Sequence, residues 1–275
     1  MSFPASVPAS VPVCLVTGAA TGIGAATALR FAREGWAVAI NNFDDSTRAA
    51  AEALAAQCRE AGSETLVVDA DVGDDAACRH MVDAVAAKWG RLDALVNSAG
   101  TTRVIPHSDL DAIDADEFER IYRVNLIGMF QMTRAAAPLL RIGANEYENE
   151  HTSGRTTGAV INISSLASLN GTGSSIAYAA SKGAVNALTL SLARNLAPHV
   201  RVNAIAPGMV DDGLLRRVLG NDAYGRVLDG MRENSPLKRV SQPSEIADLA
   251  WFLAAHAPAM TGQVLAIENG LLLNT

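Results

Sequence analysis

Cysteine is scarce in this sequence. The 275 residues include three, Cys14, Cys58 and Cys78. Their spacing fits neither a zinc site nor a dithiol redox motif, so we expect small buried side chains and no metal site. Such sparse cysteine usage suits a reducing compartment, and a cytoplasmic location is expected.

Long apolar runs and clusters of positive charge are missing as well. No stretch of the sequence has the length of a bilayer span, and the net charge is −7 without a Lys/Arg run. We therefore expect no membrane and no nucleic acid among the partners. Residues 1–12 are rich in Pro, Ala and Ser but lack the basic start and apolar core of a signal peptide. A disordered tail at 1–12 and one domain over 13–275 are expected.

Short β-rich runs alternate with longer Ala-rich runs along the rest of the chain. With 49% hydrophobic and 19% charged residues, the composition is that of a globular protein. The alternation predicts a single α/β domain, a doubly wound Rossmann-type parallel sheet of about seven strands with helices on both faces. The expected strands are 13–17, 37–41, 65–69, 94–97, 160–164, 202–206 and 263–267. The expected helices are 23–34, 46–61 with Ser46 as N-cap, 74–89, 116–140, 178–196 and 245–255.

Two segments interrupt this alternation. Residues 141–157 are polar and rich in Gly and Asn, which favours a solvated or interface loop at the sheet edge opposite the ligand. Residues 209–236 follow a strand, so they are expected on the ligand side, because ligands bind at the carboxyl ends of parallel strands.

A glycine-rich turn follows the first expected strand. Its sequence from Thr17 is TGAATGIG, ending at Gly24. Glycines allow a tight turn and a close backbone approach, and the helix that follows offers free N–H groups to a phosphate. The position of the turn between strand and helix predicts a dinucleotide-binding loop.

Tyr178 and Lys182 are four residues apart in an expected helix and so share one face. A cation one turn away favours the phenolate and lowers the phenol pKa, which makes Tyr178 a possible general acid/base. A Tyr-x-x-x-Lys pair on its own also arises by chance on a surface helix.

The order of several motifs resembles the short-chain dehydrogenase/reductase family over nearly the whole chain, in the ordinary single-domain form. The matching elements are the turn 17–24, Asp71-Val72, Asn97-Ser98-Ala99-Gly100, Asn125, Ser165, Tyr178, Lys182 and Pro207-Gly208. The resemblance implies hydride transfer between NAD(P) and a secondary alcohol or ketone.

The resemblance also implies roles for a catalytic tetrad. Tyr178 would exchange a proton with the substrate oxygen, and Lys182 would lower its pKa and hold the nicotinamide ribose. Ser165 would hydrogen-bond the substrate oxygen, with Ser164 and Ser168 as competitors for that role. Asn125 would hold a water that links Lys182 to solvent.

The cofactor contacts implied by the resemblance involve sixteen residues, and the sequence departs from the family pattern at Asn42 and Asp212. Asn42 stands where an Asp would bind the ribose 2′-hydroxyl, so Asp44 or Asp45 could replace it and NAD(P) stays open. Asp212 stands where Thr often binds the carboxamide, and we assign that contact to the backbone of Val210. The full set is Gly18, Thr21, Gly22, Ile23, Gly24, Asn42, Asp71, Val72, Asn97, Ala99, Gly100, Tyr178, Lys182, Pro207, Gly208 and Val210.

Substrate choice is expected from 101–107 and 209–236. One alternative is an apolar substrate covered by Leu214, Leu215, Val218, Leu219 and Met231. The other is a polar one recognised by Arg103 or His107. The chain is similar to family members called 3-oxoacyl-carrier-protein reductases and glucose dehydrogenases, and the family implies a homotetramer. A non-catalytic dinucleotide-sensing protein on the same fold is the alternative function.

Overall fold

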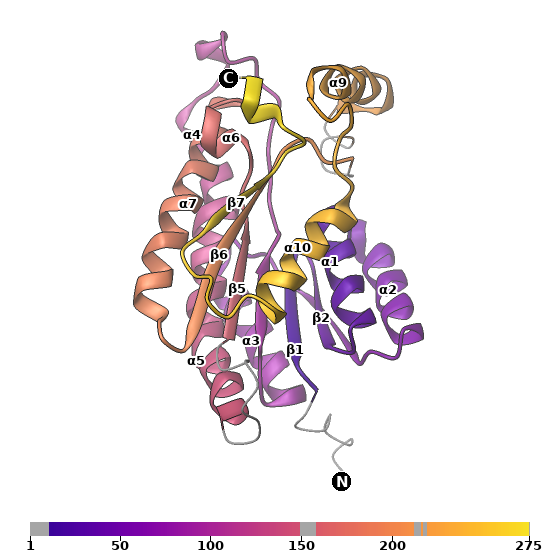
Figure 1. Cartoon of the computed structure of the whole chain (residues 1–275), viewed down its shortest axis with the longest axis vertical. Helices are drawn as coiled ribbons and strands as arrows, with labels where there is room; N and C mark the ends of the chain where they lie inside the picture. Colours follow the sequence, from indigo (N-terminus) through magenta and orange to yellow (C-terminus); the bar gives the residue numbers. More distant parts are fainter. Residues whose placement is uncertain (1–10, 149–157, 212–215, 217–218, 275) are drawn as a thin grey trace.

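The computed structural model describes residues 11–148, 158–211, 216 and 219–274, and Figure 1 shows the element order. Seven parallel strands form one sheet in the order β3-β2-β1-β4-β5-β6-β7. Their bounds are β1 Val13–Thr17, β2 Ala37–Asn42, β3 Thr65–Asp69, β4 Ala94–Asn97, β5 Gly158–Ile163, β6 Val200–Pro207 and β7 Val264–Ile267. The predicted doubly wound Rossmann-type sheet is confirmed.

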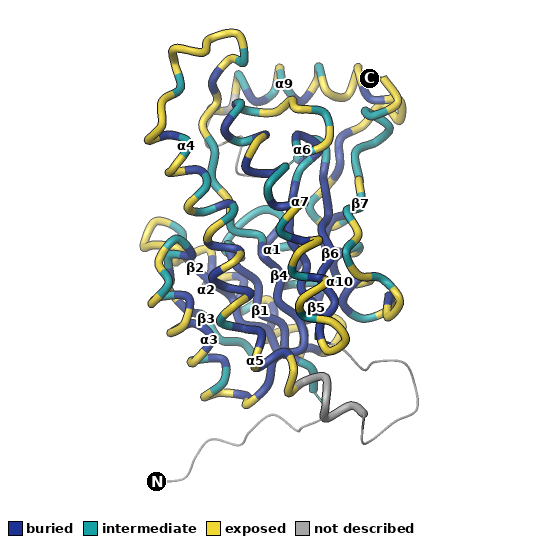
Figure 2. The backbone as a smooth tube through the Cα atoms, turned by 90° about the vertical axis from the view of Figure 1, so that its left-hand side faces the viewer, coloured by how far each residue is buried: buried dark blue, intermediate teal, exposed yellow. Residues whose placement is uncertain are grey.

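Helices cover both faces of the sheet. Side chains of α1, α2 and α10 form one apolar core against it, and those of α3, α5 and α7 form the other. The central strands are buried along their whole length (Figure 2). The helices are α1 Gly22–Arg33, α2 Asp45–Glu60, α3 Asp75–Trp89, α4 Ala115–Tyr122, α5 Met129–Glu148, α6 Ala167–Asn170, α7 Ile176–Leu196, α9 Asn221–Asn234 and α10 Pro243–Ala255.

The middle of the chain differs from the predicted helix 116–140 and loop 141–157. A π-helical turn, η2 (Arg123–Gly128), separates α4 from α5. Helix α5 then continues to Glu148, because Gly and Asn lower helix propensity without preventing a helix. Residues 149–157 lie outside the described part of the chain.

The start of α2 also differs from expectation. The helix begins at Asp45, and the side chain of Asp44 caps it by accepting a hydrogen bond from the Ser46 N–H. Both residue types are good N-caps, so sequence preference alone did not distinguish Asp44 from Ser46.

The N-terminal end of the domain contacts the sheet from Val11 onward. Val11 packs against the core, and the carbonyl of Pro12 accepts a hydrogen bond from the Ala37 N–H. Residues 1–10, the rest of the predicted tail, lie outside the described part of the chain. All three cysteines are buried. None of the helices in the described ranges combines the length and apolarity of a bilayer span.

Arg201 on β6 joins the sheet to the C-terminal end of α10. It is 6% exposed and donates to the carbonyls of Leu253 (2.7 Å), Ala254 (2.9 Å) and Ala257 (2.9 Å). A guanidinium here satisfies carbonyls that the helix end leaves unpaired and complements the negative pole of the helix.

Replacing Arg201 by Met is therefore expected to lower the free energy of unfolding by about 3 kcal/mol, because buried carbonyls lose a charged donor. Denaturant unfolding measures this change. The exposed Arg194, in the last turn of α7, provides the matched control, and Arg194→Met should change stability by less than about 0.5 kcal/mol. Equal stability of the two variants would contradict the capping role.

Candidate active site

A cleft of about 1120 Å³ lies at the carboxyl ends of the strands. This is the edge where a doubly wound sheet binds its ligands. Loops after six strands line the cleft, with further lining from α9 and the C-terminal segment. The loop residues are 18 and 20–24, 43–44 and 46–47, 70–72, 98–102 and 104, 163–167, and 207–210.

The glycine loop lies at one end of this cleft. Gly18 and Gly22 have φ of +60° and +58°, which favours glycine at both positions. A Cβ on Gly18 would lie 2.7 Å from the Cα of Ala99, so the loop also packs closely against the segment after β4. Thr21 and Ile23 complete the lining here.

Asn41 holds this loop in place, and sequence reasoning did not identify it. Its Oδ1 accepts from the Gly18 N–H at 3.0 Å, and its Nδ2 donates to the carbonyls of Asn42 and Ala70. The side chain thus ties β1, β2 and β3 together under the cleft. Two Asn residues at the end of a strand that is apolar up to Ile40 were the available signal.

The N-terminus of α1 is suited to an anion. Thr21 is its N-cap without a side-chain capping bond, whereas the side chains of Asp44, Asp74, Asp114 and Ser175 cap α2, α3, α4 and α7. The first turn of α1 contains no acidic residue among those described. Free N–H groups at the positive end of a helix fit the pyrophosphate of NAD(P).

Gly24 is the tightest position of the loop. A Cβ there would lie 2.4 Å from the Gly18 carbonyl oxygen, which is backbone and cannot move alone. We expect Gly24→Ala to distort the loop and weaken NAD(P)H binding at least tenfold, as measured by fluorescence titration. Gly225→Ala in α9, where a Cβ meets nothing within 4 Å, should bind as the parent does. Unchanged affinity in Gly24→Ala would contradict the placement of the pyrophosphate.

Asp71 and Val72 line the cleft after β3. One oxygen of Asp71 accepts from the Gly73 N–H at 2.8 Å, so the residue also shapes the turn before α3. Ala99 and Gly100 line the cleft after β4.

Two predicted contact residues lie elsewhere. Asn42 is 1% exposed, and its side chain bonds to Asp44, Thr47 and Asp69. Asn97 is also 1% exposed and donates to Asn162 and Thr133 inside the protein. Neither residue belongs to the described lining of the cleft, because both side chains form hydrogen bonds to neighbouring strands and helices inside the protein.

Tyr178 and Lys182 meet on the face of α7 that borders the cleft. Lys182 is 4% exposed, and its Nζ donates to the Ile163 carbonyl at 2.7 Å and lies 5.7 Å from the centroid of the Tyr178 ring. Burial disfavours the charged amine and lowers the pKa of Lys182 to about 8.

The three serines after β5 differ in what their hydroxyls contact. The Ser164 hydroxyl donates to Asn186 and is 2.7 Å from it, and the Ser168 hydroxyl donates to the Ser165 carbonyl at 2.6 Å. The Ser165 hydroxyl accepts from the Ala167 N–H at 3.2 Å and lines the cleft. Among the described residues no acceptor takes the proton of the Ser165 hydroxyl, whereas Ser164 and Ser168 both donate within the protein, which favours Ser165 over its neighbours.

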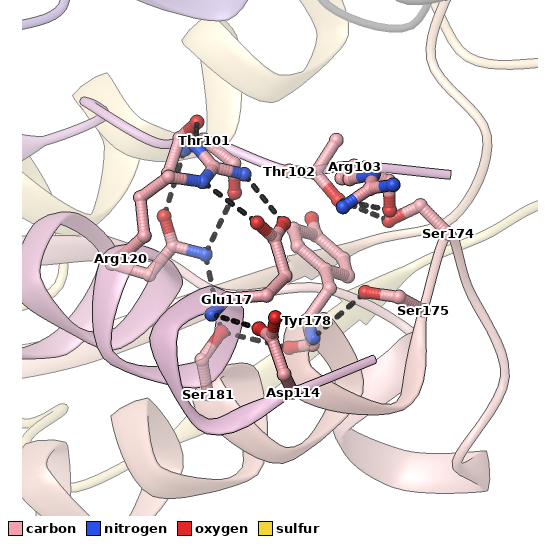
Figure 3. A network of polar contacts seen from close by, with 11 residues as sticks. Thr101, Thr102, Arg103, Asp114, Glu117, Arg120, Ser174, Ser175, Tyr178 and Ser181 are labelled. Carbon is pink, nitrogen blue, oxygen red and sulfur yellow. Dashed lines mark hydrogen bonds and ion pairs between the residues drawn. The ribbon is translucent and has the colours of Figure 1, made fainter. Parts of the chain in front are cut away.

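Asn125 lies in the π-helical turn, beneath the cleft and fully buried. Its side chain accepts from the Thr101 N–H at 2.8 Å and donates to the Thr101 carbonyl and to the Ser181 hydroxyl, both at 3.1 Å. The close-up in Figure 3 shows this network beside Tyr178, with Arg120 bound to Glu117 and Thr101. The π turn thus fixes the segment after β4 against α7.

Pro207, Gly208 and Val210 line the cleft after β6. The Met209 carbonyl accepts from the Ser241 N–H, and the Asp211 N–H donates to the Ser241 carbonyl. The N–H and carbonyl of Val210, between them, therefore face away from Ser241. Leu214, Leu215, Val218 and Asp212 lie outside the described part of the chain. Leu219 and Met231 line the cleft, whereas Arg103 and His107 are not among its described lining residues.

Comparison with known proteins shows the family of the chain. The family profile described as enoyl-(acyl carrier protein) reductase matches residues 18–272. The chain is 38% identical over 262 residues to the ketoacyl reductase 2 assigned to the granaticin polyketide synthase of Streptomyces violaceoruber, covering 94% of this chain and 95% of that one.

Two solved structures have the same fold. A Burkholderia xenovorans protein assigned to the short-chain dehydrogenases/reductases is 67% identical, with a TM-score of 0.86 over 96% of this chain and 99% of that one. NAD⁺-bound xylitol dehydrogenase is 33% identical, with a TM-score of 0.80 over 94% and 98%. The chain belongs to the short-chain dehydrogenase/reductase family and is an NAD(P)-dependent oxidoreductase.

Proposed function

We propose that the enzyme interconverts a secondary alcohol and its ketone, with Tyr178 as the general acid/base. The observation that carries this proposal is that Ser165, Tyr178 and Lys182 all line the cleft, with the Lys182 side chain almost fully buried and its amine 5.7 Å from the centroid of the Tyr178 ring. When bound, NAD(P) supplies or accepts the hydride. The residues of the chain deal with the proton and with the charge on the substrate oxygen.

Tyr178 donates its hydroxyl proton to the ketone oxygen in reduction and accepts a proton from the alcohol in oxidation. The Lys182 ammonium beside the ring stabilises the phenolate, which lowers the pKa of Tyr178 toward the working pH. Ser165 donates a hydrogen bond to the same substrate oxygen as its charge develops. Asn125 acts one layer deeper, close to Gly100 and Lys182, where a water could pass the proton to solvent.

The cofactor is held by the residues already located in the cleft. The N-terminus of α1 and the glycine loop would hold the pyrophosphate, Asp71 and Val72 the adenine, and Ala99 and Gly100 would pack along the ribose. Lys182 would also hold the nicotinamide ribose, and the backbone of Val210 would bind the carboxamide.

The far end of the cleft favours an apolar substrate body. Val104 and Met231 line the cleft and leave 40% and 39% of their surface exposed. Leu219 and Leu271 line the same cleft. Covering such side chains with an apolar ligand is favourable. His107 lies apart, with its Nε2 3.2 Å from the Gly173 carbonyl oxygen.

We also propose a cytoplasmic homotetramer. Ile127 on η2, Phe130 on α5 and Leu190 on α7 are 47%, 41% and 49% exposed, which leaves large apolar side chains for a second copy of the chain. Light scattering at four chain masses would support this assembly. A single chain mass at micromolar concentration would contradict it.

The proposed reaction is tested by incubating the purified enzyme with NADH or NADPH and a panel of aliphatic, alicyclic and sugar ketones and acyl thioesters. Loss of the nicotinamide absorbance together with formation of the alcohol is the expected result. A non-catalytic dinucleotide sensor would bind the reduced cofactor without consuming it. The complete set of Asn125, Ser165, Tyr178 and Lys182 disfavours that alternative.

A further inference from the structure

The end of the cleft between β2 and α2 carries an acidic residue that faces the ligand space. Phe43, Asp44, Ser46 and Thr47 line the cleft there. In dinucleotide-binding sheets, the residue after the second strand meets the adenosine ribose, where a carboxylate binds the 2′-hydroxyl of NAD and an arginine accommodates the 2′-phosphate of NADP. The charge at this position therefore selects the cofactor.

Asn42 cannot make that selection. Its Nδ2 donates to the Asp44 carbonyl at 2.7 Å and to Asp69 at 2.9 Å, and its Oδ1 accepts from the Thr47 hydroxyl at 2.6 Å. With three hydrogen bonds and 1% exposure, the Asn42 side chain is buried and connects β2, β3 and α2.

Asp44 is placed differently. It is exposed and lines the cleft, and its Oδ1 accepts hydrogen bonds from the N–H and the hydroxyl of Ser46. Its Oδ2 accepts no hydrogen bond from the described residues. One carboxylate oxygen thus remains for a ribose hydroxyl while the other keeps the backbone in position.

The cations that follow β2 or line the cleft are paired with other residues or lie beside other segments. Arg48 is ion-paired with Asp69 and with Glu52, and it is not among the described lining residues. The turn from Thr17 to Gly24 contains no Lys or Arg. Arg123 lines the cleft beside Gly73, and Arg120, which also lines it, is bound to Glu117 and Thr101.

The α2 N-terminus offers no compensation. Its positive pole already interacts with the carboxylate of Asp44 and with Asp45 in the first turn. A 2′-phosphate placed here would meet like charge, whereas a 2′-hydroxyl would find an acceptor.

We infer that this enzyme selects NAD(H) over NADP(H), and that Asp44 is the residue that makes the selection. This inference rests on the proposed function only in that the cleft binds a nicotinamide dinucleotide. It assigns to Asp44 the contact that Asn42, buried in its own hydrogen bonds, does not make.

The test is a fluorescence titration of the full-length enzyme with NADH and NADPH, without substrate. We expect NADH to bind at least about tenfold more tightly, as repulsion between partly exposed charges a few ångströms apart predicts. In Asp44→Ser, which keeps a good helix cap and removes the charge, that ratio should fall to about threefold or less. Asp44→Asn is a second variant that keeps the cap if the first does not fold.

Asp45→Ser is the matched control, because it removes the same charge from the same helix turn at a residue outside the described lining. The ratio in this control should stay near that of the parent. A parent that binds NADPH equally or more tightly overturns the inference, as does an unchanged ratio in the Asp44 variants or an equal fall in Asp45→Ser. Failure to bind either cofactor would instead contradict the proposed function itself.

Discussion

Tyr178→Phe is expected to lower kcat by about a thousandfold, because the substitution removes the proton that the substrate oxygen exchanges and leaves the ring in place. The dissociation constant of the cofactor should change less than about threefold, since the phenol contributes little of the cofactor's contact surface. Steady-state kinetics and fluorescence titration measure the two quantities separately.

Tyr122→Phe is the matched control for this change. Tyr122 ends α4, packs near the Phe118 ring and does not belong to the described lining of the cleft. The same loss of a hydroxyl there should leave kcat within about twofold of the parent. A Tyr178→Phe variant that turns over as fast as Tyr122→Phe would contradict the proton-transfer role.

Lys182→Met is expected to inactivate the enzyme and yet stabilise it at neutral pH. Activity should fall at least about a hundredfold because the phenolate loses its cation. The stability gain follows from burial, which lowers the Lys182 pKa from 10.5 to about 8 and thus makes the charged amine costly to fold. The shift corresponds to about 3 kcal/mol, from which the lost bond to the Ile163 carbonyl subtracts about 1 kcal/mol.

The pH dependence separates this cause from a packing effect. Between about pH 8 and about pH 10.5 the unfolded chain holds the Lys182 proton that the folded chain has lost. The free energy of unfolding of the parent should therefore rise with pH across that window relative to the variant, and below pH 8 the full penalty applies. Denaturant unfolding of both proteins at pH 7 and pH 10 measures the difference. A stability difference between the parent and Lys182→Met that is the same at both pH values, whatever its sign, would contradict the buried-charge account.

The sequence predicted the strands of the fold closely, because each is a short run rich in apolar residues, and five of the seven described strands are buried along their whole length. It also predicted the glycine loop, since tight backbone approaches at Gly18 and Gly24 leave a readable pattern. These features depend on local chemistry that one segment carries by itself.

Features that depend on contacts between segments were not predicted. Asn42 stands at the sequence position expected to contact the ribose, but its side chain is buried and hydrogen-bonded to Thr47 and Asp69. No local sequence pattern predicts these bonds. The π turn around Asn125 arises where Gly128 packs against Val72, since a Cβ on Gly128 would lie 2.9 Å from the Val72 side chain. Asn41, which holds the glycine loop, is identified only by the strands that it joins.

Deuterium transfer tests the central claim most directly. The parent and Tyr178→Phe would each be mixed with the ketones of the panel and with the reduced cofactor, NADH or NADPH, in which deuterium replaces the hydrogen that is transferred as hydride. Mass spectrometry would then follow the alcohol that forms. The account predicts one deuterium on the carbinol carbon with the parent, and formation of this product about a thousandfold more slowly with Tyr178→Phe. Labelled alcohol formed by both proteins at the same rate, or alcohol formed without the label, would contradict it.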